Sequence, residues 1–553
     1  MNKKYILSVA AGALLTLSSC TKDLDVKPLD PNVMTAEKAY ASSEDAYLRG
    51  LNKIYSIWAM SGQDGEGSSD IKGLDAGNCQ LMRSWWNLNE VCTDEAKNAW
   101  GDDWVTAVNS ITWNTMQNEA IEGAYQRSMF IVALANEYIT QVSKANFAEQ
   151  PQYIAEARFC RALAYSVLLD LFRNPPFITE SNYSNSPAPV GDREKGINPT
   201  LFNWIVTELN ECKANLPAAG KGVYGHADQG AADFLLARLY LNAEIYAGEN
   251  HYTDCVEACK RVIAGGYSLS AKYENLFMAD NDQTCKNEII FPIVYDGAAT
   301  KTWGGMTFLI MASVGGKETD MKEYKGVNSG WDGMRPTGQF IDIFEFDDDA
   351  NPTAATVKDK RLLCSDKGIG EDPETKEVKE YDRKQHIVTT PKATFAQEGW
   401  EITKFRNQTS TGLVNDDAWP DTDFPMFRLA DVYLMYAEAV LRGGTGGDTG
   451  TAVGYINDLR KRGYTGTTGN ISQADMTLDF ILDERARELY WEGTRRTDLI
   501  RFGKFTKGYN WDFKGGVNTG TNVEDYYIIY PIPATDLTVN PNLKQNKGYI
   551  NEE

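Results

Sequence analysis

Residues 231–241 read AADFLLARLYL, in which small alanines and bulky leucines follow the 3.6-residue apolar period of a helix. A turn at Gly248, Glu249 and Asn250 comes next, and the apolar period resumes from Tyr252 to Ile263. Small residues at a crossing let two helices approach closely, while large ones fill the space between them. The stretch therefore predicts a stacked helical hairpin, the unit from which helical-repeat solenoids are built.

Two further stretches repeat this pattern. Residues 153–165 read YIAEARFCRALAY, and residues 427–439 read FRLADVYLMYAEA before a Gly-rich loop and a second periodic run at 453–462. We therefore predict a mainly α fold with a tetratricopeptide-like helical-repeat scaffold. Helix pairs stand on both sides of the irregular segments, so the sequence predicts one domain from residue 20 to 553 without an internal linker.

Two long segments, residues 60–115 and 295–420, are rich in aromatic residues and glycine and show no convincing helical period. Loops held by a rigid scaffold carry binding residues more often than the scaffold itself does. Irregular segments of this length are also uncommon inside a compact domain unless they are functional. We expect the functional site in these two segments.

The N-terminus has the pattern of a bacterial lipoprotein signal. Lys3 and Lys4 precede an apolar run over residues 5–15, which is too short to cross a bilayer, and LSSC follows at residues 17–20. We predict a signal peptide over residues 1–19, a lipidated Cys20 and a polar tether over about residues 20–35. The alternative is an ordinary signal peptide with a chance cysteine. No later segment has the ~18 apolar residues of a transmembrane helix.

Composition argues against several functions. A formal net charge of -22 and a pI near 4.7 argue against a nucleic-acid partner, although the acidity is also typical of a solvated surface. Walker, Rossmann, GxSxG and zinc motifs are absent from the sequence, so we predict that the protein is not an enzyme. With 77 acidic residues, however, a glycosidase-type carboxylate pair is not excluded. Cys255 and Cys259 share one helix face, which favours a pair of core thiols over a disulfide.

Aromatic side chains are numerous, with 13 Trp, 28 Tyr and 21 Phe. Six tryptophans lie in the irregular segments beside polar residues: Trp85, Trp86, Trp100, Trp104, Trp303 and Trp331. A sugar ring has apolar C–H faces and a rim of hydroxyls, so flat rings with polar side chains at their edges suit it. The alternative for each of these tryptophans is that its ring packs in the hydrophobic core and contacts no ligand.

The C-terminal part carries a family signature. Residues 484–503 read ERARELYWEGTRRTDLIRFG, which resembles the hallmark of the SusD/RagB family, and YPIP at 530–533, NPN at 540–542 and QNKGY at 545–549 resemble its closing segment. The resemblance extends through TDE at 93–95, LFMADND at 276–282 and PDTD at 420–423. It implies a lipid-anchored outer-membrane protein facing the cell exterior. Such a protein captures starch or related α-1,4-glucans and delivers them to a SusC-like TonB-dependent transporter without cleaving them.

The resemblance also implies an arc of three aromatic rings that fits a coiled α-1,4-glucan. The matching positions here are Trp100, Trp303 and Trp331. Trp303 stands where the family's starch-binding member has a tyrosine, and this exchange keeps a flat ring face.

Four polar contacts are implied beside the arc. Asp75 and Arg83 keep the residue type of the family's starch-binding member, whereas Asp103 replaces an asparagine and Asn98 replaces a tryptophan. The change at Asp103 exchanges an amide donor for an acceptor, so one sugar hydroxyl must reverse its hydrogen bond.

A structural calcium ion is implied by the same resemblance, through Asp282, Asp421 and Asp423. Hard oxygen donors on loops suit calcium. Alternatively, Asp421 and Asp423 cap the helix expected from Phe427. Two other functions stay open at this point. One is a glycoside hydrolase. The other is a protein-binding helical-repeat lid for a transporter of another glycan or nutrient, with no starch binding.

Overall fold

The computed structural model describes residues 44–182, 189–317, 321–372, 374–389 and 394–549. The predicted signal peptide, Cys20 and the tether lie outside these residues. The chain divides into two compact units, Met1–Tyr47 and Leu48–Glu553. The following description concerns the second unit, together with the helix whose first residues belong to the first. Within the described ranges, no helix is long and apolar enough to cross a membrane.

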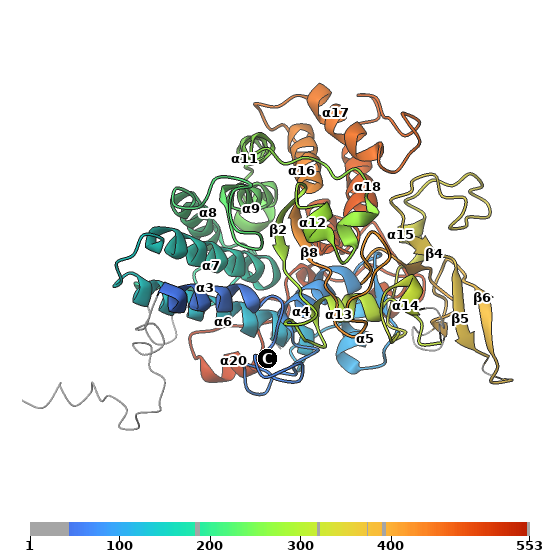
Figure 1. Ribbon diagram of the computed structural model, residues 1–553, viewed down its shortest axis with the longest axis horizontal. Helices are drawn as coiled ribbons and strands as arrows, with labels where there is room; N and C mark the ends of the chain where they lie inside the picture. Colours follow the sequence, from blue (N-terminus) through green and yellow to red (C-terminus); the bar gives the residue numbers. More distant parts are fainter. Residues whose placement is uncertain (1–43, 183–188, 318–320, 373, 390–393, 550–553) are drawn as a thin grey trace, which may run out of the picture. The chain divides into compact units, whose positions relative to one another are not determined.

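Helices dominate the fold, which confirms the predicted mainly α, tetratricopeptide-like class. The principal helices are α3 (Glu44–Ser56), α6 (Glu119–Val142), α7 (Gln150–Phe172), α8 (Pro199–Lys213), α9 (Gln229–Leu241), α10 (Ala243–Ala247), α11 (Tyr252–Ala264), α16 (Leu429–Leu441), α17 (Thr449–Arg460), α18 (Leu478–Leu489) and α19 (Arg495–Arg501). From α6 to α9 each helix packs on its sequence neighbour, α11 packs on α9, and α16 joins α11 to α17 and α18 (Figure 1). The hairpin predicted at 231–263 corresponds to α9 and α11.

Helix α9 shows why alanine recurs in these hairpins. Asp228 caps it by accepting a hydrogen bond from the backbone N–H of Ala231, which satisfies one free donor of the first turn. Ala231, Phe234 and Leu236 are fully buried, so the helix is apolar around most of its circumference and lies inside the solenoid. Burying each large side chain stabilises the fold by roughly 1.5–3 kcal/mol.

The helix predicted from Phe427 begins two residues later than expected. Phe427 belongs to strand β8 (Phe424–Arg428), which pairs antiparallel with β2 (Ile289–Ile293), and α16 starts at Leu429. The Phe427 ring stacks on Phe234 with ring centroids 4.3 Å apart. Strand pairing satisfies the backbone of a segment that is buried throughout, so tertiary contacts override the local helical period.

The irregular segments contain short elements that the sequence did not reveal. Residues 60–115 include α4 (Leu81–Trp86), a π-helical turn (Asn87–Val91), β1 (Lys97–Asn98) and α5 (Asp103–Ser110). Residues 295–420 include α13 (Gly305–Met311), α14 (Met321–Tyr324), β3 (Met334–Arg335), α15 (Gly338–Ile341), β4 (Cys364–Ser365), β5 (Lys367–Glu371), β6 (Val378–Asp382) and β7 (Glu401–Ile402). The strands pair as β1–β3, β4–β7 and the hairpin β5–β6. These elements are too short to show a period in sequence.

Buried ion pairs join the signature 484–503 to the rest of the chain. The Arg495 guanidinium contacts the Asp94 carboxylate at 2.7 Å, and Arg361 contacts Glu484 at 2.8 Å. Asp94 and Arg361 come from the two irregular segments, so the signature connects these segments to α18 and α19. A buried charge that loses its partner is costly, and these pairs therefore make the arrangement specific.

Cysteine packing follows the sequence expectation. Cys255 and Cys259 are both fully buried on α11 and both are free thiols. Burial raises the pKa of the Cys259 thiol well above its ordinary value, with the neighbouring Cys255 adding to the rise. The pair is part of the core, as predicted.

Candidate functional site

An antiparallel pairing brings two of the predicted tryptophans together. Strand β1 pairs with β3, and just beyond it the backbone N–H of Ala99 donates to the carbonyl of Gly333 at 2.7 Å. A side chain at Gly333 would place its Cβ 3.0 Å from the Trp100 ring, so glycine allows the ring to lie against this backbone. The indole N–H of Trp100 then donates to the carbonyl of Trp331 at 2.9 Å.

Helix α13 sets the separation between Trp303 and Trp331. Trp303 lies two residues before the start of this helix, and the backbone N–H of Trp331 donates to the carbonyl of Met311 at its other end, at 2.9 Å. Gly305 begins the helix with a φ of +51°, and a Cβ there would lie 2.1 Å from the Tyr295 hydroxyl, so only glycine fits.

The tryptophans form a continuous row. The ring centroids of Trp100 and Trp331 are 6.3 Å apart with planes inclined by 45°, and those of Trp331 and Trp303 are 6.2 Å apart with planes inclined by 46°. Trp303 is 43% exposed, while Trp100 and Trp331 are half-buried. The structure therefore brings all three predicted rings together at the surface.

The row continues into a ring that sequence analysis did not single out. Trp419, also half-buried, packs on Trp303 with centroids 4.8 Å apart and planes inclined by 55°. Its position within the aromatic-rich segment 295–420, beside Asp416 and Asp417, is the same signal that identified Trp303 and Trp331. Two other tryptophans of the irregular segments, Trp85 and Trp86, are instead buried in α4.

Arg83 supports the row from beneath. Its guanidinium carbon lies 4.3 Å from the centroid of Phe308 and 5.4 Å from that of Trp100, in the geometry of a cation–π contact. One guanidinium nitrogen donates to the carbonyl of Trp303 at 3.2 Å. Burial lowers the pKa of Arg83 to about 10, against the opposing effect of the Asp75 carboxylate, so the side chain is a cation at neutral pH.

The other predicted polar residues take different places. Asp75 is exposed and accepts hydrogen bonds from the backbone N–H groups of Gly77 and Asn78, at 2.8 and 2.6 Å. Asp103 is exposed at the first residue of α5. Asn98 is buried, and its side-chain oxygen accepts from the backbone N–H of Trp100 at 3.0 Å. The structure therefore makes Asn98 a residue that positions Trp100.

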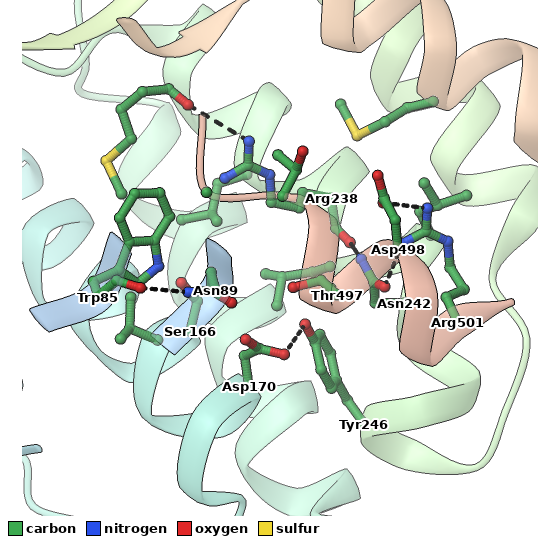
Figure 2. Close-up of a pocket in the computed structure, with 18 of the residues that line it drawn as sticks. Trp85, Asn89, Ser166, Asp170, Arg238, Asn242, Tyr246, Thr497, Asp498 and Arg501 are labelled. Atoms are coloured by element: carbon green, nitrogen blue, oxygen red, sulfur yellow. Dashed lines mark hydrogen bonds and ion pairs between the residues drawn. The ribbon is translucent and has the colours of Figure 1, made fainter. Parts of the chain in front are cut away.

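Two cavities differ in what they can hold. A pocket of about 350 Å³ opens beside Trp100 and Trp331, with Asp332, Glu371 and Phe395 in its lining, and its volume is in the range of small-ligand sites. A smaller cavity of about 60 Å³, lined by Asp170, Arg238, Tyr246 and Arg501 among others, is shown in Figure 2. That volume suits a few water molecules and is too small for a sugar.

The smaller cavity is lined by hydrogen-bonded polar groups as well as by apolar side chains. The Tyr246 hydroxyl donates to Asp170 at 3.0 Å, and Arg501 donates to Asn242 at 2.8 Å and to Asp498 at 2.7 Å (Figure 2). Each of these groups already has a partner within the protein. We therefore assign the cavity to the structural core and the tryptophan row to the candidate site.

The predicted calcium ligands lie near one another. Burial raises the pKa of Asp423 to about 7, and the carboxylates of Asp282 and Asp421 add to the rise. The two oxygens of Asp423 accept hydrogen bonds from the backbone N–H of Tyr295 and the hydroxyl of Tyr224, both at 2.7 Å. Asp421 is likewise hydrogen-bonded, to the backbone N–H of Gly297.

These contacts test the helix-capping interpretation of Asp421 and Asp423 directly. The helix-capping alternative was wrong, because α16 has Arg428 at its N-cap position and the side chains of Asp421 and Asp423 bond elsewhere. The repulsion among the three acids suits a cation, yet the part of the chain that the structure describes contains no group of three or more acidic, His or Cys side chains arranged to hold a metal. Calcium therefore stays a prediction.

The fold and the row define a helical-repeat protein that displays adjacent aromatic rings at its surface. The family model described as the SusD family matches residues 287–549. The starch-binding protein SusD of Bacteroides thetaiotaomicron is 35% identical over 99% of this chain and 100% of its own length. The chain therefore belongs to the SusD family.

More distant relatives share the length and the fold. A SusD-like protein of Bacteroides ovatus is 23% identical over 91% of this chain and 83% of its own. A crystal structure of a SusD superfamily protein from Bacteroides thetaiotaomicron covers 91% of this chain and 99% of its own, with a TM-score of 0.67 and 21% identity. The structure of a surface glycan-binding protein of the same organism in complex with laminarihexaose covers 91% of this chain and 99% of its own, with a TM-score of 0.64 and 17% identity.

Proposed function

We propose that this chain is a cell-surface glycan-binding lipoprotein that captures starch or related α-1,4-glucans and delivers them, uncleaved, to a SusC-like TonB-dependent transporter. The continuous row of Trp100, Trp331 and Trp303 carries the proposal. Three adjacent rings that reach the surface form an apolar patch, and such a patch often marks a binding site. The 35% identity to a protein named for starch binding supports the same ligand class.

The proposed chemistry is stacking with polar contacts at the edges. Each indole face covers the C–H face of one glucose unit, and successive inclined planes suit a polymer that curves from one unit to the next. Asp75 and Asp103 are exposed acceptors for sugar hydroxyls, whereas Arg83 and Asn98 hold the rings. Lipidation at Cys20 is proposed to retain the protein at the outer membrane.

Affinity electrophoresis tests this function. In native gels containing starch, the wild-type protein should be retarded, and Trp331→Ala should weaken starch binding at least about tenfold, because it removes the central ring of the row. Trp331→Phe keeps a flat ring and should bind with an intermediate affinity. Trp204→Ala, which removes a half-buried tryptophan on α8, is the matched control and should be retarded like the wild type.

Other outcomes identify the competing functions. Retardation by laminarin without starch would assign a β-glucan ligand in place of the α-glucan. Release of reducing ends from starch would reveal a glycoside hydrolase. A blank glycan array together with co-purification of a large barrel protein would favour a protein-binding scaffold.

A further inference from the structure

Trp419 extends the tryptophan row beyond the residues already assigned to it. The order along the row is Trp100, Trp331, Trp303 and Trp419, with neighbouring centroids 6.3, 6.2 and 4.8 Å apart. The inclination between neighbouring planes, 45°, 46° and 55°, changes little from one pair to the next. The fourth ring is therefore in contact with the row and is inclined much as the other three are.

The surroundings of Trp419 differ from those of a core ring. The side chain is half-buried, and Trp303, against which it packs, is 43% exposed. Asp416 and Asp417, three and two residues before Trp419, are both partly exposed. Core tryptophans of this chain look different: Trp86 is 1% exposed, and its indole N–H donates to the carbonyl of Trp491.

The loop that carries Trp419 is held in place by its own hydrogen bonds. The Asp416 carboxylate accepts from the backbone N–H groups of Ala418 and Trp419, at 2.8 and 3.3 Å. The carbonyl of Trp419 lies so close to Gly297 that a Cβ on that glycine would come within 2.2 Å of it. A ring on a preorganised loop loses little conformational freedom when a ligand covers it.

The same loop is joined to the segment that leads to Trp331. The backbone and side-chain amides of Asn328 donate to the carbonyl and the carboxylate of Asp417, at 2.9 and 3.0 Å. Asn328 is exposed and lies three residues before Trp331. The loops that carry Trp419 and Trp331 are thus hydrogen-bonded directly to each other. These bonds hold the Trp331 and Trp419 rings at a constant separation on either side of Trp303.

We propose that Trp419 is a fourth glycan-stacking residue and that it makes the protein selective for longer α-glucan chains. The inference rests on the proposed function and deepens it. A short oligosaccharide is accommodated by the first three rings alone, whereas a longer chain reaches Trp419 and gains an additional stacking contact. Removal of this ring should therefore weaken the binding of long ligands selectively.

Titration calorimetry with maltotriose and maltoheptaose tests the proposal on the full-length protein. For Trp419→Ala, affinity for maltoheptaose should fall about two- to tenfold while affinity for maltotriose stays within twofold of the wild type. Trp419→Phe keeps a ring and should retain most of the length dependence. Leu413→Ala, in an exposed part of the same segment, is the control and should bind both ligands as the wild type does.

Each remaining outcome overturns the inference in a distinguishable way. Equal losses for both ligands would make Trp419 a support for Trp303, and unchanged affinities would make it a bystander. In both cases the wild-type protein still binds α-glucan, so the proposed function stands. If the wild type binds neither oligosaccharide, the proposed function and this inference fail together.

Discussion

The indole N–H of Trp100 donates to the backbone carbonyl of Trp331 at 2.9 Å, which joins two surface rings that lie 231 residues apart in sequence. The bond fixes the edge of the first ring to the backbone of the second. Their relative inclination is therefore set before any ligand arrives, and a ligand does not have to order them.

Trp100→Phe tests this bond, because phenylalanine keeps a flat ring and lacks the N–H donor. We expect the free energy of unfolding to fall by about 1 kcal/mol in urea denaturation, since the Trp331 carbonyl loses its partner. Starch affinity should fall less than in Trp100→Ala. Trp303→Phe is the control, because it leaves the bond between Trp100 and Trp331 intact. Equal stability losses in the two Phe variants would contradict the role given to the bond.

Gly77 lies beneath the row, where a Cβ would come 3.1 Å from the Cβ of Trp303 and 3.5 Å from the Arg83 guanidinium and the Asp75 carboxylate. Gly77→Ala should therefore displace Trp303 and reduce starch retention in an affinity gel. Gly67→Ala, where an added Cβ meets nothing within 4 Å, should leave retention unchanged. Identical behaviour of the two alanine variants would show that the placement of Trp303 does not control binding.

Arg428 pairs with the buried carboxylates of Glu288, Glu488 and Glu492, at 3.1, 2.6 and 2.6 Å. Arg428→Met leaves these acids without their shared partner and should destabilise the protein by about 3–5 kcal/mol in urea denaturation. Lys461→Met removes only an exposed ion pair with Asp458 and should cost less than about 1 kcal/mol. A small loss in Arg428→Met would mean that Arg462, Arg361 and Lys404, which also pair with these acids, are sufficient to hold them.

Glu95 gives stability a dependence on pH. Burial and the neighbouring Asp94 carboxylate raise the pKa of Glu95 to about 7, although the Arg495 guanidinium acts in the opposite direction. Burial also raises the pKa of the neighbouring Glu90. The folded protein thus holds a proton that the unfolded chain releases near pH 4.5, so this group destabilises the fold progressively as pH rises from about 4.5 to about 7. The free energy of unfolding, measured by urea denaturation between pH 5 and pH 8, should show that decline.

Glu95→Gln should flatten the decline, because a neutral amide does not titrate. Glu374→Gln, at an exposed position, should leave it unchanged. If the slope against pH is the same in all three proteins, other groups are responsible.

Calcium should stabilise the protein if Asp282, Asp421 and Asp423 bind it, because a divalent cation relieves the repulsion that helps raise the pKa of Asp423. At a concentration tenfold above its Kd, a ligand adds about 1.4 kcal/mol to the free energy of unfolding. Asp423→Asn should abolish the difference in Tm between calcium and EDTA, whereas Asp458→Asn, on the exposed face of α17, should preserve it. An unchanged wild-type Tm at millimolar calcium would refute the site.

The helical scaffold and the segments that contain the site can be recognised from the amino-acid pattern alone. The hairpin at 231–263 was predictable because an apolar period of 3.6 is a local property, visible within a dozen residues. The aromatic content of 60–115 and 295–420 was equally visible, and the resemblance in 484–503 identified the family.

Which rings reach the surface depends on how the chain folds in three dimensions. Trp86 and Trp100 lie 14 residues apart in one aromatic segment, yet Trp86 is buried against Trp491 while Trp100 joins the row. Asn98, which the family resemblance places beside a ligand, is buried and holds the backbone of Trp100, and Trp419 joins the row although no motif in the sequence marks it. The reason is physical: helical period depends on neighbours three or four residues away, whereas the exposure of a ring depends on partners hundreds of residues distant, which a linear pattern does not encode.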